Sequence, residues 1–310
     1  MARRDINGIL LLDKPEGISS SQALVRVRGI YKAQKGGHTG ALDPLASGLL
    51  PICLGQAAKF SSFFLEGDKR YVAVGKLGEI TATADREGEV ILRRPLGDAL
   101  TRLPEAIAHF TGPITQVPPI YSAVKVAGKP LYAYARQGRE VEIPSRDVTI
   151  YALKLLDTTA DSFCVEVHCS KGTYIRTLIA DIGEYLGCGA YVTSLRRTEV
   201  AGLPTTMIGL DDLQQMANQK QSADDFAALD ALLLPVDLAV GRLPQLTLPS
   251  ARASAFTHGV RQPLASVVKH SRDFDMHEPL AIRAPDGRFL GVAQLQDGML
   301  IPKRLMAPID

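Results

Sequence analysis

Apolar and polar positions repeat with two different periods along the chain, which predicts a mixture of strands and helices. Short apolar or alternating runs at 8–13, 70–78, 89–93, 147–157 and 162–169 predict strands. Spacings of three and four residues predict helices at about 19–31, 99–111 and 174–186, the first capped by serines and the second ended by Gly112-Pro113. This order of elements argues against a simple parallel α/β sheet.

The segment 35–51 has the composition of a loop but carries many apolar side chains. It is rich in glycine, proline and small residues. It also contains leucines that are costly to leave in water, namely Leu42, Leu45, Leu49 and Leu50. We therefore expect an irregular loop that packs around a specific site.

The sequence from residue 118 onward predicts an arm, a connecting segment and a separate small domain. Residues 118–146 contain five Lys or Arg and three Tyr, which favours a largely exposed, mobile arm. Residues 202–240 are rich in Gln, Asp and Ala and predict connecting structure. Strand runs at 279–284, 288–295 and 298–302 are separated by Asp-Gly pairs typical of hairpins. We expect a larger domain over 1–245 and a small β domain over 246–310.

Length and composition are those of an ordinary globular protein. The 310 residues are 46% hydrophobic and 22% charged, enough for a sizeable core. No apolar run reaches the roughly 20 residues that a membrane helix needs. The four cysteines include no C-x-x-C pair, and strand alternation separates Cys169 from Cys164 and His168, so neither a disulfide framework nor a metal site is expected. These features favour a cytoplasmic protein with no membrane contact.

Charge is distributed unevenly, although the net charge is only +2. Residues 1–60 carry eight Lys or Arg and four Asp or Glu, whereas residues 205–240 carry one Lys and six Asp. A basic amino-terminal stretch suggests a polyanionic partner such as nucleic acid.

The sequence from Gly36 to Pro51, GGHTGALDPLASGLLP, carries the most specific chemical signal. The carboxylate of Asp43 stands among glycines, prolines and leucines, which allow close approach of a ligand and exclude water. Such a carboxylate can act as a nucleophile. An Asp before Pro44 is also typical of a turn cap, so the residues alone leave both interpretations open.

This run resembles the signature of the TruB family of pseudouridine synthases. Further matches follow in the family's order: Lys14-Pro15, Lys69-Arg70-Tyr71 and the run KGTYIR at 171–176. The arm, from YSAVK at 121–125 through YARQG at 134–138, resembles the family's RNA-gripping insertion, and residues from about 249 onward resemble a PUA domain. The chain departs from the family at Ala82, where an acid is usual, but it retains Asp85.

The resemblance implies an α+β fold: a bent mixed sheet flanked by helices, plus a small β-barrel-like PUA domain. It also implies a monomer that binds the T-arm stem-loop of tRNA and converts a flipped-out uridine of the T loop, position 55, to pseudouridine. The reaction moves the glycosidic bond from N1 to C5 without redox change, so no cofactor is expected. Attack on C1′, addition to C6 and abstraction of the 2′ proton all remain open as the role of the aspartate.

The resemblance also implies roles for individual residues. Asp43 is the expected catalytic carboxylate, Arg176 its ion-pair partner, and Tyr71 the ring that stacks on uracil and relays the C5 proton. A phosphate contact is the alternative for Arg176. The expected substrate-binding residues are His38, which fills the gap left by the flipped base, Tyr174 and Leu195 in the pocket wall, and Lys14 and Arg70, which meet phosphates together with Lys32, Lys35, Lys59 and Lys69.

Two other functions fit parts of the sequence. A glycoside or nucleoside hydrolase also uses an Asp, but it commonly needs a second carboxylate, and none stands near Asp43 in sequence. A non-catalytic RNA-folding factor would use only the arm and the tail domain. A zinc deaminase and a P-loop enzyme are excluded because their motifs are missing.

Overall fold

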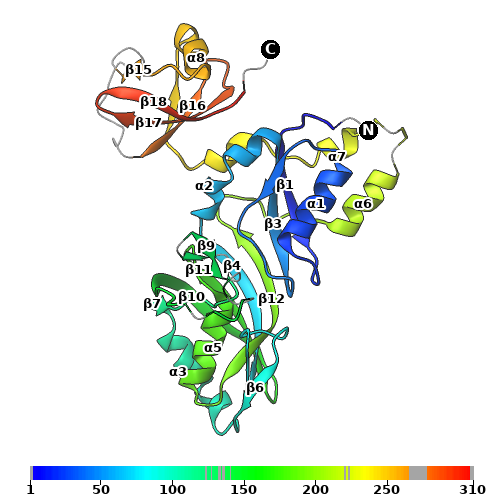
Figure 1. Ribbon diagram of the computed structural model, residues 1–310, viewed down its shortest axis with the longest axis vertical. Coiled ribbons are helices and arrows are strands. Elements are labelled where there is room, and N and C mark those ends of the chain that lie inside the picture. Colours follow the sequence, from blue (N-terminus) through cyan, green and yellow to red (C-terminus); the bar gives the residue numbers. More distant parts are fainter. Residues whose placement is uncertain are drawn as a thin grey trace.

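The structure is a computed structural model that describes residues 3–307 except 123, 127, 132–133, 135–136, 140, 220, 223 and 265–277. It consists of a long mixed sheet, which we call the main sheet, and a smaller C-terminal sheet at one end of the molecule (Figure 1). Parts of the expected arm, including Ala123, Ala135 and Arg136, lie outside the described residues.

The main sheet has the strand order β13-β1-β3-β12-β4-β11-β10-β7, and β2 pairs with β3 beside this path. Two pairs, β1 with β13 and β12 with β3, are parallel, and the others are antiparallel. The strands are β1 (Gly8–Lys14), β2 (Gly36–His38), β3 (Ala46–Leu54), β4 (Lys69–Leu77), β7 (Gly112–Gln116), β10 (Arg146–Thr158), β11 (Ser162–Cys169), β12 (Ala190–Val200) and β13 (Ile208–Gly209).

Helices pack against both ends of this sheet. Helix α1 (Ser20–Ile30) contacts β3 and α6 (Leu210–Asn218), whereas α5 (Ile175–Tyr185) contacts β12 and β4, and α3 (Ala99–His109) contacts β10. The first helix begins with a reciprocal capping box between Ser19 and Gln22, which confirms the serine cap expected from sequence. The mixed sheet with its helices confirms the α+β class.

Two central strands were not predicted from the sequence. Strand β3 occupies much of the segment that we expected to be a loop, because Gly48 and Pro51 interrupt its apolar pattern. Strand β12 has polar and apolar positions without a clear hairpin signal, yet it pairs with both β3 and β4. Its place at the centre of the sheet therefore comes from long-range pairing.

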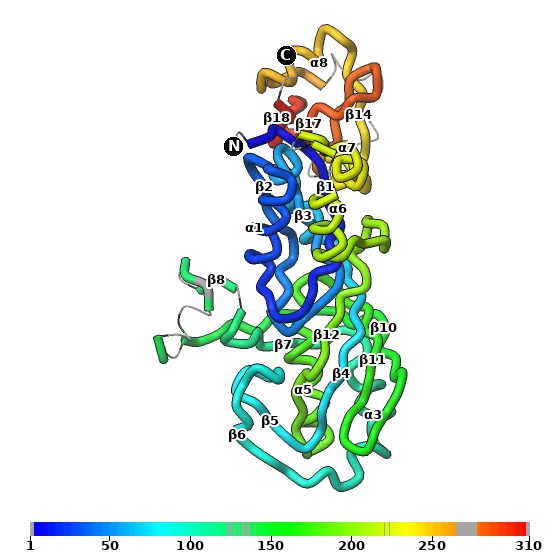
Figure 2. Tube along the Cα trace, turned by 90° about the vertical axis from the view of Figure 1, so that its right-hand side faces the viewer, coloured from blue at the N-terminus to red at the C-terminus, as the bar shows by residue number. Residues whose placement is uncertain are grey.

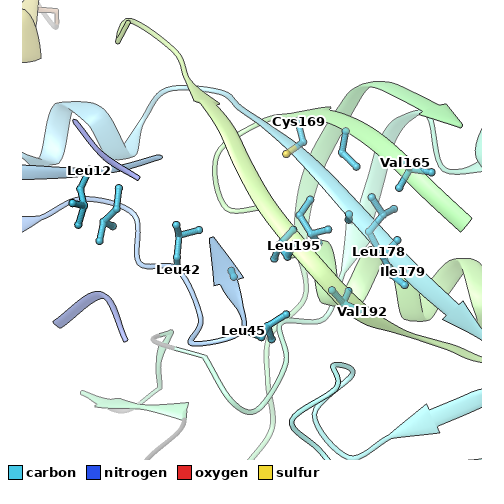
Figure 3. Close-up of a cluster of buried hydrophobic side chains, with 14 of the residues drawn as sticks. Leu12, Leu42, Leu45, Val165, Cys169, Leu178, Ile179, Val192 and Leu195 are labelled. Carbon is cyan, nitrogen blue, oxygen red and sulfur yellow. The ribbon is translucent and has the colours of Figure 1, made fainter. Parts of the chain in front are cut away.

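The leucines of the segment 35–51 are buried, as expected. Leu42 and Leu45 join the main core beside Leu195 of β12 and Leu178 of α5 (Figure 3). Full burial of each such side chain is worth about 1.5–3 kcal/mol. This packing fixes the chain on both sides of Asp43.

The arm is partly exposed and partly buried. Its described residues include a short hairpin of β8 (Lys125–Val126) and β9 (Lys129–Pro130), and Figure 2 shows β8 standing away from the main sheet. Ser122 and Leu131 are nevertheless buried. The other residues of 121–146 whose burial the structure describes are exposed or half-buried.

The C-terminal sheet has the order β14-β16-β17-β18-β15 and is covered by α8 (Ser250–Thr257). Its strands are β14 (Gln245–Thr247), β15 (Gln262–Pro263), β16 (Pro279–Arg283), β17 (Phe289–Gln296) and β18 (Met299–Leu305). The two expected hairpins are present, and Asp297 and Gly298 adopt positive φ in the second turn. This part contacts the main body through an edge-to-face pair of Phe60 and Phe289, with ring centroids 5.1 Å apart.

The remaining elements are short. The region 202–240, expected to be connecting structure, contains α6, α7 (Ala227–Asp230) and the 3-10 turn η2 (Val236–Val240). Other short elements are η1 (Gly55–Lys59), α2 (Ser62–Leu65), β5 (Glu79–Thr81) and β6 (Val90–Arg93). In the described part of the chain, no helix has both the length and the apolar content needed to cross a bilayer.

Candidate active site

A cavity of about 860 Å³ opens where the loop between β2 and β3 meets β4, β12 and the start of α5. This volume lies in the range of sites that hold a nucleotide-sized ligand. Seven of the residues expected from sequence line it, namely His38, Asp43, Lys69, Tyr71, Tyr174, Arg176 and Leu195. The fold thus gathers residues that are up to 157 positions apart (195 minus 38) in one pocket.

The loop that carries Asp43 is held by hydrogen bonds on both sides of the carboxylate. The Ser20 hydroxyl accepts from the Leu42 amide at 2.8 Å and donates to the Leu42 carbonyl at 2.9 Å. The amide of Gly17 donates to the carbonyl of Pro44 at 2.8 Å. These contacts tie the loop to the start of α1 and pre-organise the carboxylate.

Arg176 joins two carboxylates at the edge of the cavity. Its Nε lies 2.9 Å from Asp43, and its Nη1 lies 3.2 Å from Asp85. It also donates to the carbonyl of Thr83 at 3.1 Å and to that of Tyr121 at 2.8 Å. Since all its nitrogens already have partners, the geometry favours the ion-pair role over a phosphate contact.

Asp43 is the accessible member of this group. Its side chain is 40% exposed, whereas those of Arg176 and Asp85 are 5% and 4% exposed. Burial raises the pKa of Asp43, and the positive charges of Arg176 and Lys14 oppose that rise. The result is a carboxylate that faces the cavity with a pKa above its ordinary value and an arginine bound to it.

The turn after β5 places Asp85 in contact with Arg176. Asp85 accepts a hydrogen bond from the amide of Glu87 at 3.0 Å, and Ala84 adopts a φ of 58°. Ala82, the position that departs from the family pattern, is exposed and pairs through its amide with the carbonyl of Glu89. The departure therefore leaves the Asp85–Arg176 contact in place.

Tyr71 and Leu195 form neighbouring parts of the wall. Tyr71 lies on β4 and Leu195 on β12, and these strands pair with each other. Burial raises the pKa of the Tyr71 hydroxyl, while the charge of Arg197 and a hydrogen bond to it work in the opposite direction. Leu195 is 6% exposed and also packs into the main core.

His38 and Tyr174 lie on the rim of the same cavity. Burial, with a smaller effect of Arg197, lowers the pKa of His38, so its ring is neutral at neutral pH. Its Nδ1 is buried without a hydrogen-bond partner. The backbone of Tyr174 exchanges two hydrogen bonds, of 3.0 and 3.2 Å, with the side chain of Gln116.

Three expected phosphate contacts receive no support from the structure. Lys14 is fully buried, and its ammonium donates to the carbonyls of Pro15 and Ile18. Lys69 is likewise buried and bonded to the carbonyls of Leu65 and Gly67.

Arg70 does not line the cavity, because strand alternation turns it to the face opposite Tyr71. There it pairs with Glu199 at 3.0 Å and Glu166 at 3.6 Å. The K-R-Y motif therefore places its lysine and its tyrosine at the cavity and its arginine on the opposite face of the strand.

Two residues of the site carry no clear signal in the sequence. Gln116 and Arg197 are polar side chains that are 1% and 2% exposed, in strands β7 and β12 that were not predicted. A polar residue inside a strand pattern normally faces solvent, so their burial could not be foreseen. Among the described residues, no group of His, Cys, Asp or Glu has the geometry to hold a metal ion.

The bent mixed sheet, with an aspartate, an arginine and a tyrosine around one cavity, defines the class of pseudouridine synthases. Solved structures of similar fold include a Cbf5-Nop10-Gar1 complex, with a TM-score of 0.74 at 24% identity over 97% of this chain and 85% of that one. A second is an H/ACA RNP bound to a substrate RNA, with a TM-score of 0.73 at 22% identity over 98% of this chain and 86% of that one. At these identities the likeness concerns the fold alone.

Sequence comparison defines the family. The model described as "TruB family pseudouridylate synthase (N terminal domain)" matches residues 28–175, and two further models of TruB C-terminal regions match 176–241 and 244–306. Proteins named tRNA pseudouridine synthase B from Aeromonas salmonicida and Mannheimia succiniciproducens are each 48% identical over 98% of this chain, and over 94% and 97% of their own lengths. The chain belongs to the TruB family of pseudouridylate synthases.

Proposed function

We propose that this enzyme converts a uridine in the T loop of tRNA, position 55, to pseudouridine. The single observation that carries the proposal is the Asp43–Arg176 pair, 2.9 Å apart, at the mouth of a nucleotide-sized cavity. The relatives named tRNA pseudouridine synthase B, which match nearly the full chain, supply the substrate class.

The geometry supports a chemical role for each residue in the wall. Asp43 is accessible and oriented, so it is the group that engages the ribose or the base. Arg176 holds it through the ion pair. Tyr71 offers a ring for stacking and an oxygen for the C5 proton, and Leu195 supports the base from beneath. His38 stands at the rim, where a neutral ring can occupy the space vacated by the flipped nucleotide.

We also propose that residues 1–245 form the catalytic unit and residues 246–310 a PUA-like RNA-binding unit. The separate C-terminal sheet and the separate family match from 244 support this division. The exposed basic residues near the amino terminus, such as Lys35 and Lys59, suit a polyanion. We further propose a monomer that acts in the cytoplasm, where its free thiols stay reduced.

Mapping the product tests the substrate. Unmodified tRNA and an isolated T-arm stem-loop are incubated with the enzyme, and pseudouridine is located by mass spectrometry of nuclease fragments. We expect one modified nucleotide, in the T loop, in both RNAs. Modification only outside the T loop would overturn the proposed specificity, and free uracil would indicate a hydrolase.

A further inference from the structure

Arg197 is a buried arginine that pairs with no carboxylate among the described residues. It is 2% exposed, and among the described residues no salt bridge involves it. A buried charge is costly unless strong polar partners surround it, so its position needs an explanation. It also lines the cavity that holds Asp43 and Tyr71.

The backbone of Arg197 connects the two strands that flank the cavity. In the main sheet Arg197 stands opposite Tyr71 of β4 and beside Gly48 of β3. A Cβ on Gly48 would lie 2.2 Å from the Arg197 carbonyl oxygen, so only glycine permits this approach. The arginine is thus placed between the strand of the tyrosine and the strand that follows the Asp43 loop.

The guanidinium of Arg197 reaches both catalytic segments. Its Nε donates to the Leu49 carbonyl at 2.7 Å and its Nη2 to the Gly40 carbonyl at 2.8 Å, three residues before Asp43. Arg197 also stands opposite Tyr71 in the strand pair, both side chains line the cavity, and the charge of Arg197 acts to lower the Tyr71 pKa against the effect of burial. The guanidinium therefore binds the loop of the carboxylate directly and lies on the strand that pairs with the strand of the tyrosine.

We propose that Arg197 is a positioning residue that aims the Tyr71 oxygen at C5 of the base and stabilises its anionic form. The proposal rests on the function proposed above. In that step the C5–H bond breaks, its proton passes to the Tyr71 phenolate oxygen, and its electron pair restores the ring double bond while N1 gains a proton. A permanent positive charge beside the phenolate favours that form in a buried site.

The test is the isotope effect of deuterium at C5 of the target uridine, measured in single turnovers with wild type, Arg197→Lys and Arg197→Met. An isotope effect compares two substrates on one enzyme, so it does not depend on the fraction of protein that is folded. We expect the rate to fall by about 10²-fold in Arg197→Met, the size typical of removing one preorganised donor. We also expect a larger isotope effect than in wild type, with an unchanged Kd for tRNA.

Arg196→Met is the matched control. Arg196 is the neighbouring residue on β12, and it pairs with Asp13 at 2.7 Å. Its loss removes the same charge from the adjacent position and should leave the isotope effect at the wild-type value. If the Arg197 variants fail to fold, Gly40→Ala replaces them, because a Cβ there would lie 3.0 Å from Nη1 of Arg197 in a backbone of positive φ.

The possible results distinguish a failure of the Arg197 proposal from a failure of the proposed function. An isotope effect that stays at the wild-type value in the Arg197 variants, or in Gly40→Ala if those variants do not fold, overturns the inference and leaves the enzyme assignment intact. A smaller isotope effect also overturns the inference. It would mean that the substitution slows the earlier step carried out by Asp43, so that removal of the C5 proton limits the rate less than in wild type. Absence of C5 label release from the wild-type enzyme would instead reject the proposed function.

Discussion

At the scale of single residues, the site depends on charges that are held by more than one partner. Arg176 is shared between Asp43, which faces the cavity, and Asp85, which is buried. The two carboxylates bind different nitrogens of the guanidinium, Asp43 at Nε and Asp85 at Nη1. Asp85 therefore helps to hold Arg176 in the position from which Arg176 binds Asp43.

Replacing Asp85 with Asn should therefore reduce activity without removing the cavity. We expect kcat to fall about 10-fold or more and the free energy of unfolding to drop by about 3 kcal/mol, because Arg176 loses its buried partner. Chemical denaturation and tRNA modification rates measure the two effects. Asp98→Asn, on a surface pair 4.0 Å long, should change both by little. Equal losses in the two variants would contradict this account.

Lys14 predicts a pH dependence of stability. Burial lowers its pKa from 10.5 to about 8, although Asp43, Glu16 and Glu87 partly offset the shift. Between pH 8 and 10.5 the unfolded state binds more protons at this position, so its contribution to stability rises with pH. In that window, the free energy of unfolding of the wild type should rise relative to that of Lys14→Met by up to about 1.4 kcal/mol per pH unit.

Denaturation at several pH values measures this difference. Lys35→Met serves as the control, because Lys35 is exposed. A wild-type minus Lys14→Met difference that is flat or falls with pH between 8 and 10.5 would show that the ammonium is not buried as described.

At the scale of elements, the contact between β3 and β12 holds the site together. Gly48 has a φ of 97°, and a Cβ there would meet the backbone of Arg197. Gly17 has a similar φ of 82°, but a Cβ there would meet nothing within 4 Å. Comparing alanine substitutions at the two glycines therefore separates the cost of steric contact from the cost of a left-handed backbone.

Gly48→Ala should lower the free energy of unfolding by about 4 kcal/mol or more, since strands must move apart. Gly17→Ala should cost only about 1–2 kcal/mol for the left-handed backbone. Thermal or denaturant unfolding compares them directly. Similar costs for both variants would mean that the strands are not packed as closely as the structure shows.

The same elements show what the sequence could predict. Strands and helices with a clear period, such as 162–169 and 99–111, were found within about two residues of their ends. The family resemblance, carried by the motif around Asp43 and by the K-R-Y and KGTYIR runs, predicted the residues that line the pocket. Strands β3 and β12 were missed, since their stability comes from partners far apart in sequence. Arg70 was expected at a phosphate, and its partners Glu166 and Glu199 are likewise distant in sequence. Lys14 was also expected at a phosphate, but it donates to carbonyls of the neighbouring turn, a backbone geometry that the residue types do not reveal.

At the scale of the whole molecule, the C-terminal sheet joins the main body through a shared buried cluster, to which it contributes Ala281, Phe289 and Val292. Phe60 and Phe289 meet edge to face, and Arg283 pairs with Asp237 at 2.8 Å. An aromatic pair of this kind contributes about 0.5–1.5 kcal/mol beyond the burial of its area. Because its own buried cluster is smaller than that of the main sheet, the C-terminal sheet is expected to open more readily.

Phe289→Ala should increase hydrogen exchange in β16, β17 and β18 and leave β4 and β12 near their wild-type rates. Val260→Ala is the control, because Val260 is 50% exposed on the same part of the chain. Equal acceleration in both sheets would show instead that the molecule unfolds as a single unit.

The central claim is that Asp43 carries out the isomerisation, and tritium release from tRNA labelled at C5 of uridine tests it most directly. Wild type, Asp43→Asn and the surface control Asp5→Asn are compared under identical conditions. We expect stoichiometric release by wild type and Asp5→Asn, and a release rate at least about 10⁴-fold lower in Asp43→Asn, as expected for an essential catalytic group. Release by Asp43→Asn at a rate near that of wild type would contradict the claim.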